Sequence, residues 1–135
     1  MTDTLKFERF PYPLRLVVGL FESEQKLRRA AEGLERVGFE PDSYEVLQGE
    51  EDARSLDVEG TDHGVSGRVL RALQAASSYD RDHTRRHVEH LQGGGQVLAV
   101  FVGEDEDAKR RAADVMREHG GDFINHYADN YVEAL

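Results

Sequence analysis

The feature that most constrains this chain is an internal repeat at a constant offset of 82 residues, the separation of Arg28 from Arg110. The first copy reads LRLVVGLFESEQKLRRAAEGLERVGFE and the second reads QVLAVFVGEDEDAKRRAADVMREHGGD. Agreement of this kind without a gap indicates a duplicated supersecondary unit. The matched positions are Leu16/Leu98, Val18/Val100, Glu22/Glu104, Glu24/Glu106, the RRAA of 28–31 and 110–113, and Gly38/Gly120.

Each copy has the pattern of a strand, a helix and a second strand. A Val- and Leu-rich run leads into an acidic turn, whose carboxylates suit a helix N-terminus. Apolar residues then recur at helical spacing up to Gly38 or Gly120, which can form a left-handed C-terminal cap. The third piece is SYEVL in one copy and DFINHY in the other. Two such units predict an α+β fold, a ferredoxin-like split βαβ duplication with a four-stranded antiparallel sheet and both repeat helices on one face.

The chain is expected to form a single domain over residues 1–135, since this length allows one respectable core. We place repeat 1 at about 14–47, an acidic loop and inserted helices at about 48–92, repeat 2 at about 96–128 and a C-terminal tail at 129–135. Residues 40–62 carry nine acids and one base, which indicates a solvated strand end and loop. One kinked helix or two helices are expected from Val65 to Leu91, broken near the SSYD of 77–80.

Both sides of the predicted sheet are apolar. On the first strand Leu16, Val18 and Leu20 alternate with Val17, Gly19 and Phe21, and the strand at 97–102 repeats this pattern. In a sheet with one solvent-exposed face, apolar and polar residues would alternate along each strand instead. We therefore expect the second face to be covered, either by the inserted helices or by the sheet of a partner subunit.

Composition excludes several classes of function. The net charge of −10 repels phosphate backbones and anionic lipid headgroups, so neither nucleic acid nor a membrane surface is expected as a partner. The absence of cysteine removes disulfides and thiolate chemistry. The chain begins without a signal-peptide pattern and has no apolar run of transmembrane length, so a cytoplasmic location is expected.

Three segments, VVGLFESEQKLRRAAEGLERVGF, HTRRHVEHLQGGGQVLAVFV and HYADNYVEAL, carry a resemblance to a known family. Their order and pattern resemble the general stress protein family typified by the bacterial heat-induced YflT protein. The resemblance implies a ferredoxin-like βαβ repeat domain and an association with stress, and it implies no established chemistry. Many relatives have an apolar Gly-rich middle, where this chain has an acidic loop and polar helices.

A cluster of histidines gives the main chemical hypothesis. On a helix, His83, His87 and His90 fall with Asp80 within an arc of about 80°, which favours a divalent-metal site. However, His83 and His90 would be about 10 Å apart along the helix axis, which is too far for both to bind one ion easily. The alternative is an amphipathic helix that buries Thr84, Val88 and Leu91 and carries the histidines at the border of that face.

Other motifs predict no site. HGVSG at 63–67 lacks the last glycine of a nucleophile elbow, because Arg68 follows it. GEDEDA fits a helix start, and GGGQVLAV follows a helix where a phosphate loop would precede one.

Three classes of function stay open. The first is a non-enzymatic, stress-associated protein without a cofactor that acts by self-association, as a homodimer, or by binding another protein. The second is a metal-binding protein that uses His83, His87 and His90. The third is ligand binding or catalysis in a cavity of a dimer, with His126 as acid or base and Tyr127 and Tyr131 lining the pocket.

Overall fold

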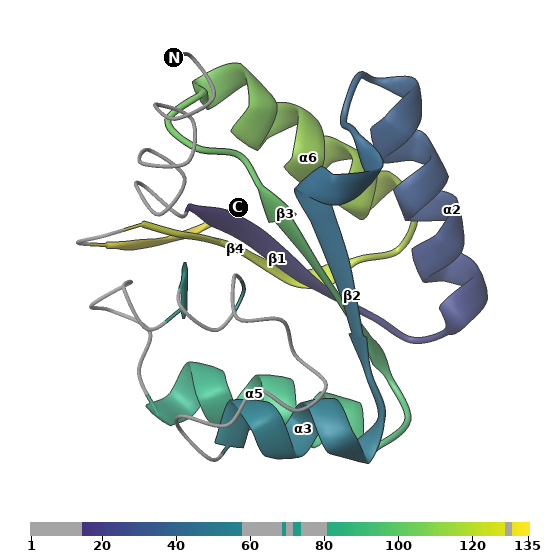
Figure 1. Cartoon of the computed structure of the whole chain (residues 1–135), viewed down its shortest axis with the longest axis vertical. Helices are drawn as coiled ribbons and strands as arrows, with labels where there is room; N and C mark the ends of the chain where they lie inside the picture. Colours follow the sequence, from purple (N-terminus) through teal and green to yellow (C-terminus); the bar gives the residue numbers. More distant parts are fainter. Residues whose placement is uncertain (1–14, 58–68, 70–71, 74–80, 129–130) are drawn as a thin grey trace, which may run out of the picture.

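The structure, a computed structural model of the chain, describes residues 15–57, 69, 72–73, 81–128 and 131–135. Its centre is an antiparallel five-stranded sheet with the strand order β2-β3-β1-β4-β5, shown in Figure 1. The strands are β1 (Leu16–Phe21), β2 (Tyr44–Gln48), β3 (Gln96–Phe101), β4 (Asp122–Tyr127) and β5 (Val132–Ala134). The expected α+β class and antiparallel sheet are therefore confirmed.

The helices of the two copies match at the offset of 82, but the strands do not, since Leu16 and Val18 lie on the opposite face of the sheet from Leu98 and Val100. Helix α2 (Glu24–Arg36) follows β1 and helix α6 (Glu106–Glu118) follows β3, and each has 13 residues. Ser23 and Asp105 cap their N-termini by accepting hydrogen bonds from backbone amides in the first turn. Gly38 and Gly120, which follow the helices, both have a positive φ, the conformation that glycine adopts at lowest cost.

Helices α2 and α6 pack side by side on one face of the sheet (Figure 1). The faces expected from residue alternation are the faces observed, because Val17 and Phe21 lie on this side with Leu98 and Val100. The helices bring small and medium apolar side chains to the same core: Leu27, Ala30, Leu34, Ala108, Ala112, Ala113, Val115 and Met116.

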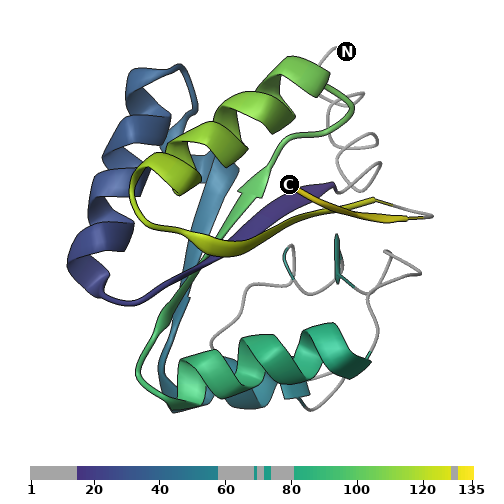
Figure 2. The same cartoon turned by 180° about the vertical axis from the view of Figure 1, so that it is seen from behind.

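The opposite face of the sheet is covered by the inserted segment. Helices α3 (Gly49–Asp57) and α5 (Arg81–Gln92) pack against one another below the sheet, as Figures 1 and 2 show from opposite sides. The buried residues of this second core are Leu16, Val18, Leu20, Leu47, Ala53, Leu56, Val69, Ala72, Leu73, Val88, Leu91, Val97, Ala99 and Tyr127. Two covers were expected for this face, the inserted helices or the sheet of a partner subunit. The structure shows the inserted helices in this place.

Two expected features are wrong in detail. Residues 49–57 form helix α3 instead of an acidic loop, because Ala53 and Leu56 are one helical turn apart and both buried. The expected tail contains strand β5, so the sheet has five strands instead of four. Val132 pairs with Tyr127, and the backbone amide of Leu135 donates to Ile124.

Several expectations fall on parts of the chain outside the described residues. They are the first strand residue at 14, the acidic residues 58–62, the HGVSG of 63–67 and the SSYD break at 77–80. The helix face expected in the insert consists of Val69, Leu70, Leu73 and Ala76. Of these, Val69 and Leu73 are described, and both are helical and buried.

The covered second face predicts that both cores contribute comparably to stability. Leu91 in α5 and Leu34 in α2 are each almost completely buried, in opposite cores. We expect Leu91→Ala and Leu34→Ala each to lower the free energy of unfolding by roughly 2–5 kcal/mol, measured by urea denaturation. A Leu91→Ala effect below about 1 kcal/mol would show that the inserted helices do not pack on the sheet as described.

Candidate functional site

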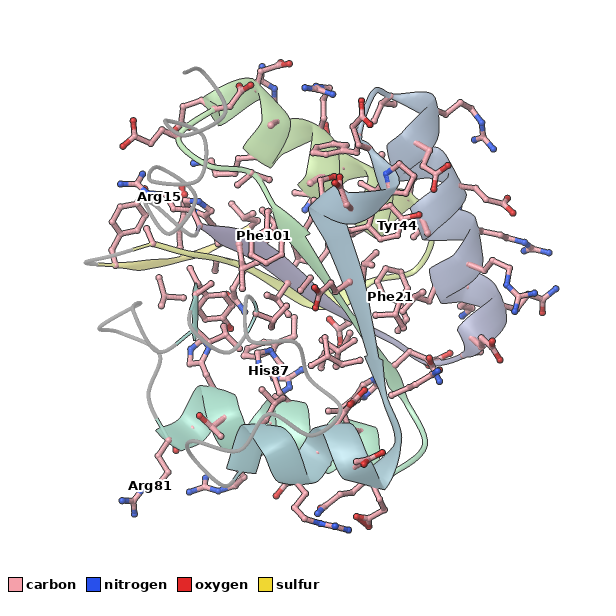
Figure 3. All side chains as sticks on the ribbon, in the orientation of Figure 1. Arg15, Phe21, Tyr44, Arg81, His87 and Phe101 are labelled. Atoms are coloured by element: carbon pink, nitrogen blue, oxygen red, sulfur yellow. The ribbon has the colours of Figure 1, made fainter. Side chains whose placement is uncertain are left out.

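The three histidines of α5 face the sheet. His83 Nδ1 and the Tyr127 hydroxyl form a hydrogen bond of 2.7 Å, and His90 Nε2 donates to the Phe21 carbonyl oxygen at 2.7 Å. His87 lies between them, directed from α5 toward the sheet in Figure 3. The predicted stripe therefore exists, and it serves as the contact between this helix and strands β1 and β4.

His87 is the most deeply buried of the three, with 1% of its surface exposed. Its ring contacts those of Phe123 and Tyr127, with centroids 5.7 and 6.1 Å away. Burial, together with smaller effects of His83, His90 and Arg86, lowers the pKa of His87 to about 3. The imidazole is therefore neutral near pH 7.

A bulge in β4 shapes the wall that receives these histidines. The register between β1 and β4 shifts between Val18 and Leu20, and Phe123 has a φ of 48°. Its ring lies 5.1 Å from that of His83, and the Arg86 guanidinium lies 4.1 Å from its centroid. Sequence analysis missed Phe123 and Arg86 as partners, since the bulge that turns Phe123 toward α5 has no clear signal in DFINHY.

The geometry gives no support to the metal hypothesis. Ring nitrogens of His83 and His90 are engaged with Tyr127 and with the backbone of Phe21. Within the described part of the chain, no three His, Asp or Glu side chains come together in a way that could hold a metal ion. Metal binding by His83, His87 and His90 stays a prediction from the sequence.

A hollow of about 410 Å³ opens beside His90, between α5 and the ends of β1 and β4. Three carboxylates line it, those of Glu22, Glu89 and Asp122, together with Arg86. Arg86 lies 3.7 Å from Asp122, and Glu22 pairs with Lys26 at 3.1 Å. These exposed pairs account for much of the charge, so the hollow has the character of a solvated surface.

His126 lies on the other face of the sheet, far from this cluster in the fold, because it pairs with Val17 of β1. It is 2% exposed, and neither ring nitrogen has a hydrogen-bond partner among the described residues. Glu133 is 3.9 Å from Nδ1, and Lys109 bridges Glu133 and Glu106 at 2.8 and 2.9 Å. Burial and the Lys109 charge lower the pKa of His126, against the opposing effect of Glu133.

Catalysis by His126 stays a prediction from the sequence. A neutral imidazole could accept a proton, and His126 lines neither the hollow beside His90 nor a second one between α6 and β5. The Tyr131 ring is tilted against that of His126, with centroids 5.8 Å apart, whereas Tyr127 faces α5 on the opposite side. The expected group of His126, Tyr127 and Tyr131 is therefore divided between the two faces.

Strand β2 is the open edge of the sheet. Among the described strands it pairs with β3 alone, and Val46 at its centre is 39% exposed. The Tyr44 hydroxyl donates to the Glu35 carboxylate and ties β2 to α2 (Figure 3), and burial and this contact raise the pKa of Tyr44 to about 12. The Asp52 carboxylate accepts a hydrogen bond of 2.7 Å from the backbone N–H of Gln48 and fixes the turn into α3. The edge is thus held in place at both ends.

Burial of His87 predicts an acid-sensitive fold. Because its pKa of about 3 lies below the ordinary value of about 6.5, the unfolded chain binds the proton first as the pH falls. This contribution to stability is complete above about pH 6.5 and is lost progressively toward pH 3. We expect roughly 2 kcal/mol less stability at pH 5 than at pH 7.5, measured by urea unfolding. His87→Leu should remove most of this difference, and an unchanged pH dependence in that variant would contradict the assignment.

The close approach of Gly95 to His90 provides a second prediction. A Cβ at position 95 would overlap the His90 ring, whereas one at position 93 would lie 3.4 Å from the Glu89 carbonyl oxygen, an ordinary contact. Gly95→Ala should therefore destabilise the protein by about 1–3 kcal/mol, because the ring cannot move without losing its bond to Phe21. Gly93→Ala is the matched control and should leave the unfolding midpoint nearly unchanged. Equal effects of the two substitutions would argue against the docked position of His90.

Within the described helices, none is long and apolar enough to cross a membrane. Comparisons with protein-family models, with curated proteins and with solved structures found no match for this chain. The candidate surfaces are accordingly characterised by their own geometry: a histidine cluster used for packing and an open sheet edge.

Proposed function

We propose that this protein is a non-enzymatic protein-interaction module that binds its partner through the open edge of strand β2. The observation that carries the proposal is the distribution of covered and open surface on the sheet. Helices α2 and α6 cover one face and α3 and α5 cover the other, so neither face is free for a partner. No described strand pairs with the outer edge of β2, so its backbone groups, apart from the Gln48 N–H that is bonded to Asp52, can pair with a partner beside the exposed Val46.

The finer description of the fold belongs to the same proposal. Units β1-α2-β2 and β3-α6-β4 are two copies of a ferredoxin-like βαβ unit, supported by the 82-residue repeat and by both helices lying on one face. The segment between the copies is an insertion that acts as a cover. The stress association is carried over from the resemblance to the general stress protein family.

The use of the histidines favours binding over catalysis. His83 and His90 hydrogen-bond to Tyr127 and to the Phe21 backbone, and His87 packs on the Phe123 ring, so all three serve as contacts between α5 and the sheet. A homodimer was expected because one apolar face of the sheet had to be covered. Helices α3 and α5 cover that face, so a homodimer is not needed for this purpose. Association, with a second copy or another protein, would use β2.

Site-specific photocrosslinking tests this function. A photoreactive amino acid, p-benzoylphenylalanine, is placed at position 46 on the edge or at position 37, since Val46 and Val37 are 39% and 40% exposed. We expect position 46 to give a discrete covalent adduct in cells that naturally produce the protein, and position 37 to give none. No adduct at position 46, or the same adducts at both positions, would contradict the proposal.

A further inference from the structure

The sequence around the open edge is strongly acidic. Residues 40–53 contain no Lys or Arg, and five of their carboxylates flank or lie on β2: Glu40, Asp42, Glu45, Glu50 and Glu51. We propose that the β2 edge binds an extended, positively charged segment of another protein, which adds to the sheet as a sixth strand. This inference rests on the proposed function and names the chemistry of its partner.

Backbone pairing would provide the affinity. An edge strand presents unpaired N–H and C=O groups, and an extended peptide satisfies them by adding one more strand. Strand β2 has five residues and is anchored at both ends, by Tyr44 to α2 and by Gln48 to Asp52, so little ordering is needed on binding. Val46 offers an apolar contact at the middle of the strand.

Charge would provide the selectivity. Carboxylates lie at both ends of the edge, Glu40 before it and Glu50 and Glu51 after it, and all three are exposed. Such an arrangement attracts cationic side chains and repels anionic ones over a Debye length, and salt screens the effect. A segment that alternates basic and apolar residues would place its charges near these acids and its apolar residues along Val46.

The same charges disfavour a second copy as the occupant. In an antiparallel pair with the two-fold axis at Val46, Tyr44 of one copy faces Gln48 of the other, and the Asp42 end of each chain meets the Glu50 end of its neighbour. This arrangement brings like charges together at both ends, which destabilises pairing. The net charge of −10 adds a general repulsion between copies.

The test uses a fluorescently labelled Lys-Val-Lys-Val-Lys peptide and the purified full-length chain, with fluorescence anisotropy as the readout. We expect saturable binding that Val46→Lys weakens by about tenfold or more. Val37→Lys adds the same charge at an equally exposed place off the edge, and should change the affinity by less than about twofold. Raising NaCl from about 0.05 to about 0.5 M should weaken binding.

Two further peptides separate backbone pairing from simple charge attraction. A Glu-Val-Glu-Val-Glu peptide should not bind, and a Lys-Val peptide with every backbone amide N-methylated should lose binding, since it has no amide N–H left to donate to the strand ladder. Amide hydrogen exchange should slow in β2 when the unmodified Lys-Val peptide is bound. Thermal unfolding of Val46→Lys and Val37→Lys checks that both variants keep the fold.

Several results would overturn the inference. These are equal binding by Val46→Lys and Val37→Lys, equal binding of the methylated peptide, or sedimentation of the free chain as a dimer that Val46→Lys dissociates. Absence of peptide binding with a persistent adduct at position 46 would reject the basic partner and keep the proposed function. Peptide binding without any adduct in cells would reject the proposed function instead.

Discussion

The packing of α5 against the sheet is the interaction on which the rest of the structure depends. A sheet with apolar side chains on both faces must bury both, and α2 and α6 can cover only one of them. Val88 and Leu91 supply apolar contact on the second face, and three histidines add directional contacts to β1 and β4. The insertion between the two sequence repeats thereby covers the second face of the sheet.

With both faces covered, the described part of the sheet is open along its edges. Strand β5 is short, and its Glu133 is held by Lys109 from α6, so that edge is tied to the fold. Strand β2 is longer, exposes Val46 and is flanked by acids. Unprotected edges invite pairing with other chains, and charges near an edge limit which chains can pair. A selective edge is consistent with a binding role that needs no catalytic residue.

Sequence reasoning was most successful where the repeat constrained it. The two helices, their ends at Gly38 and Gly120 and the two faces of β1 and β3 followed from periodicity, whereas the N-cap of α2 is Ser23 instead of a carboxylate. Helix α3 was missed because nine acids dominated the reading of residues 40–62, although Ala53 and Leu56 had helical spacing. Strand β5 has only three residues, too few to show a pattern.

The histidine helix shows why a site is harder to predict than a fold. Helical geometry correctly placed His83, His87 and His90 on one stripe, but which side of α5 is buried depends on the surface opposite. A bulge in β4 turns Phe123 toward the helix, and this aromatic wall receives His87. Phe123 lies more than 30 positions from His87 in the sequence. Composition alone therefore cannot tell whether a row of histidines on a helix binds a metal ion or packs against the rest of the fold.

The most direct test of this packing is imidazole ¹⁵N NMR of His87 across a pH titration of the folded protein. A buried ring against Phe123 and Tyr127 should stay neutral from pH 7.5 down to about pH 5 while the fold persists. Titration of His87 with an ordinary pKa of about 6.5 in the folded protein would contradict it, since α5 would then expose this face to solvent.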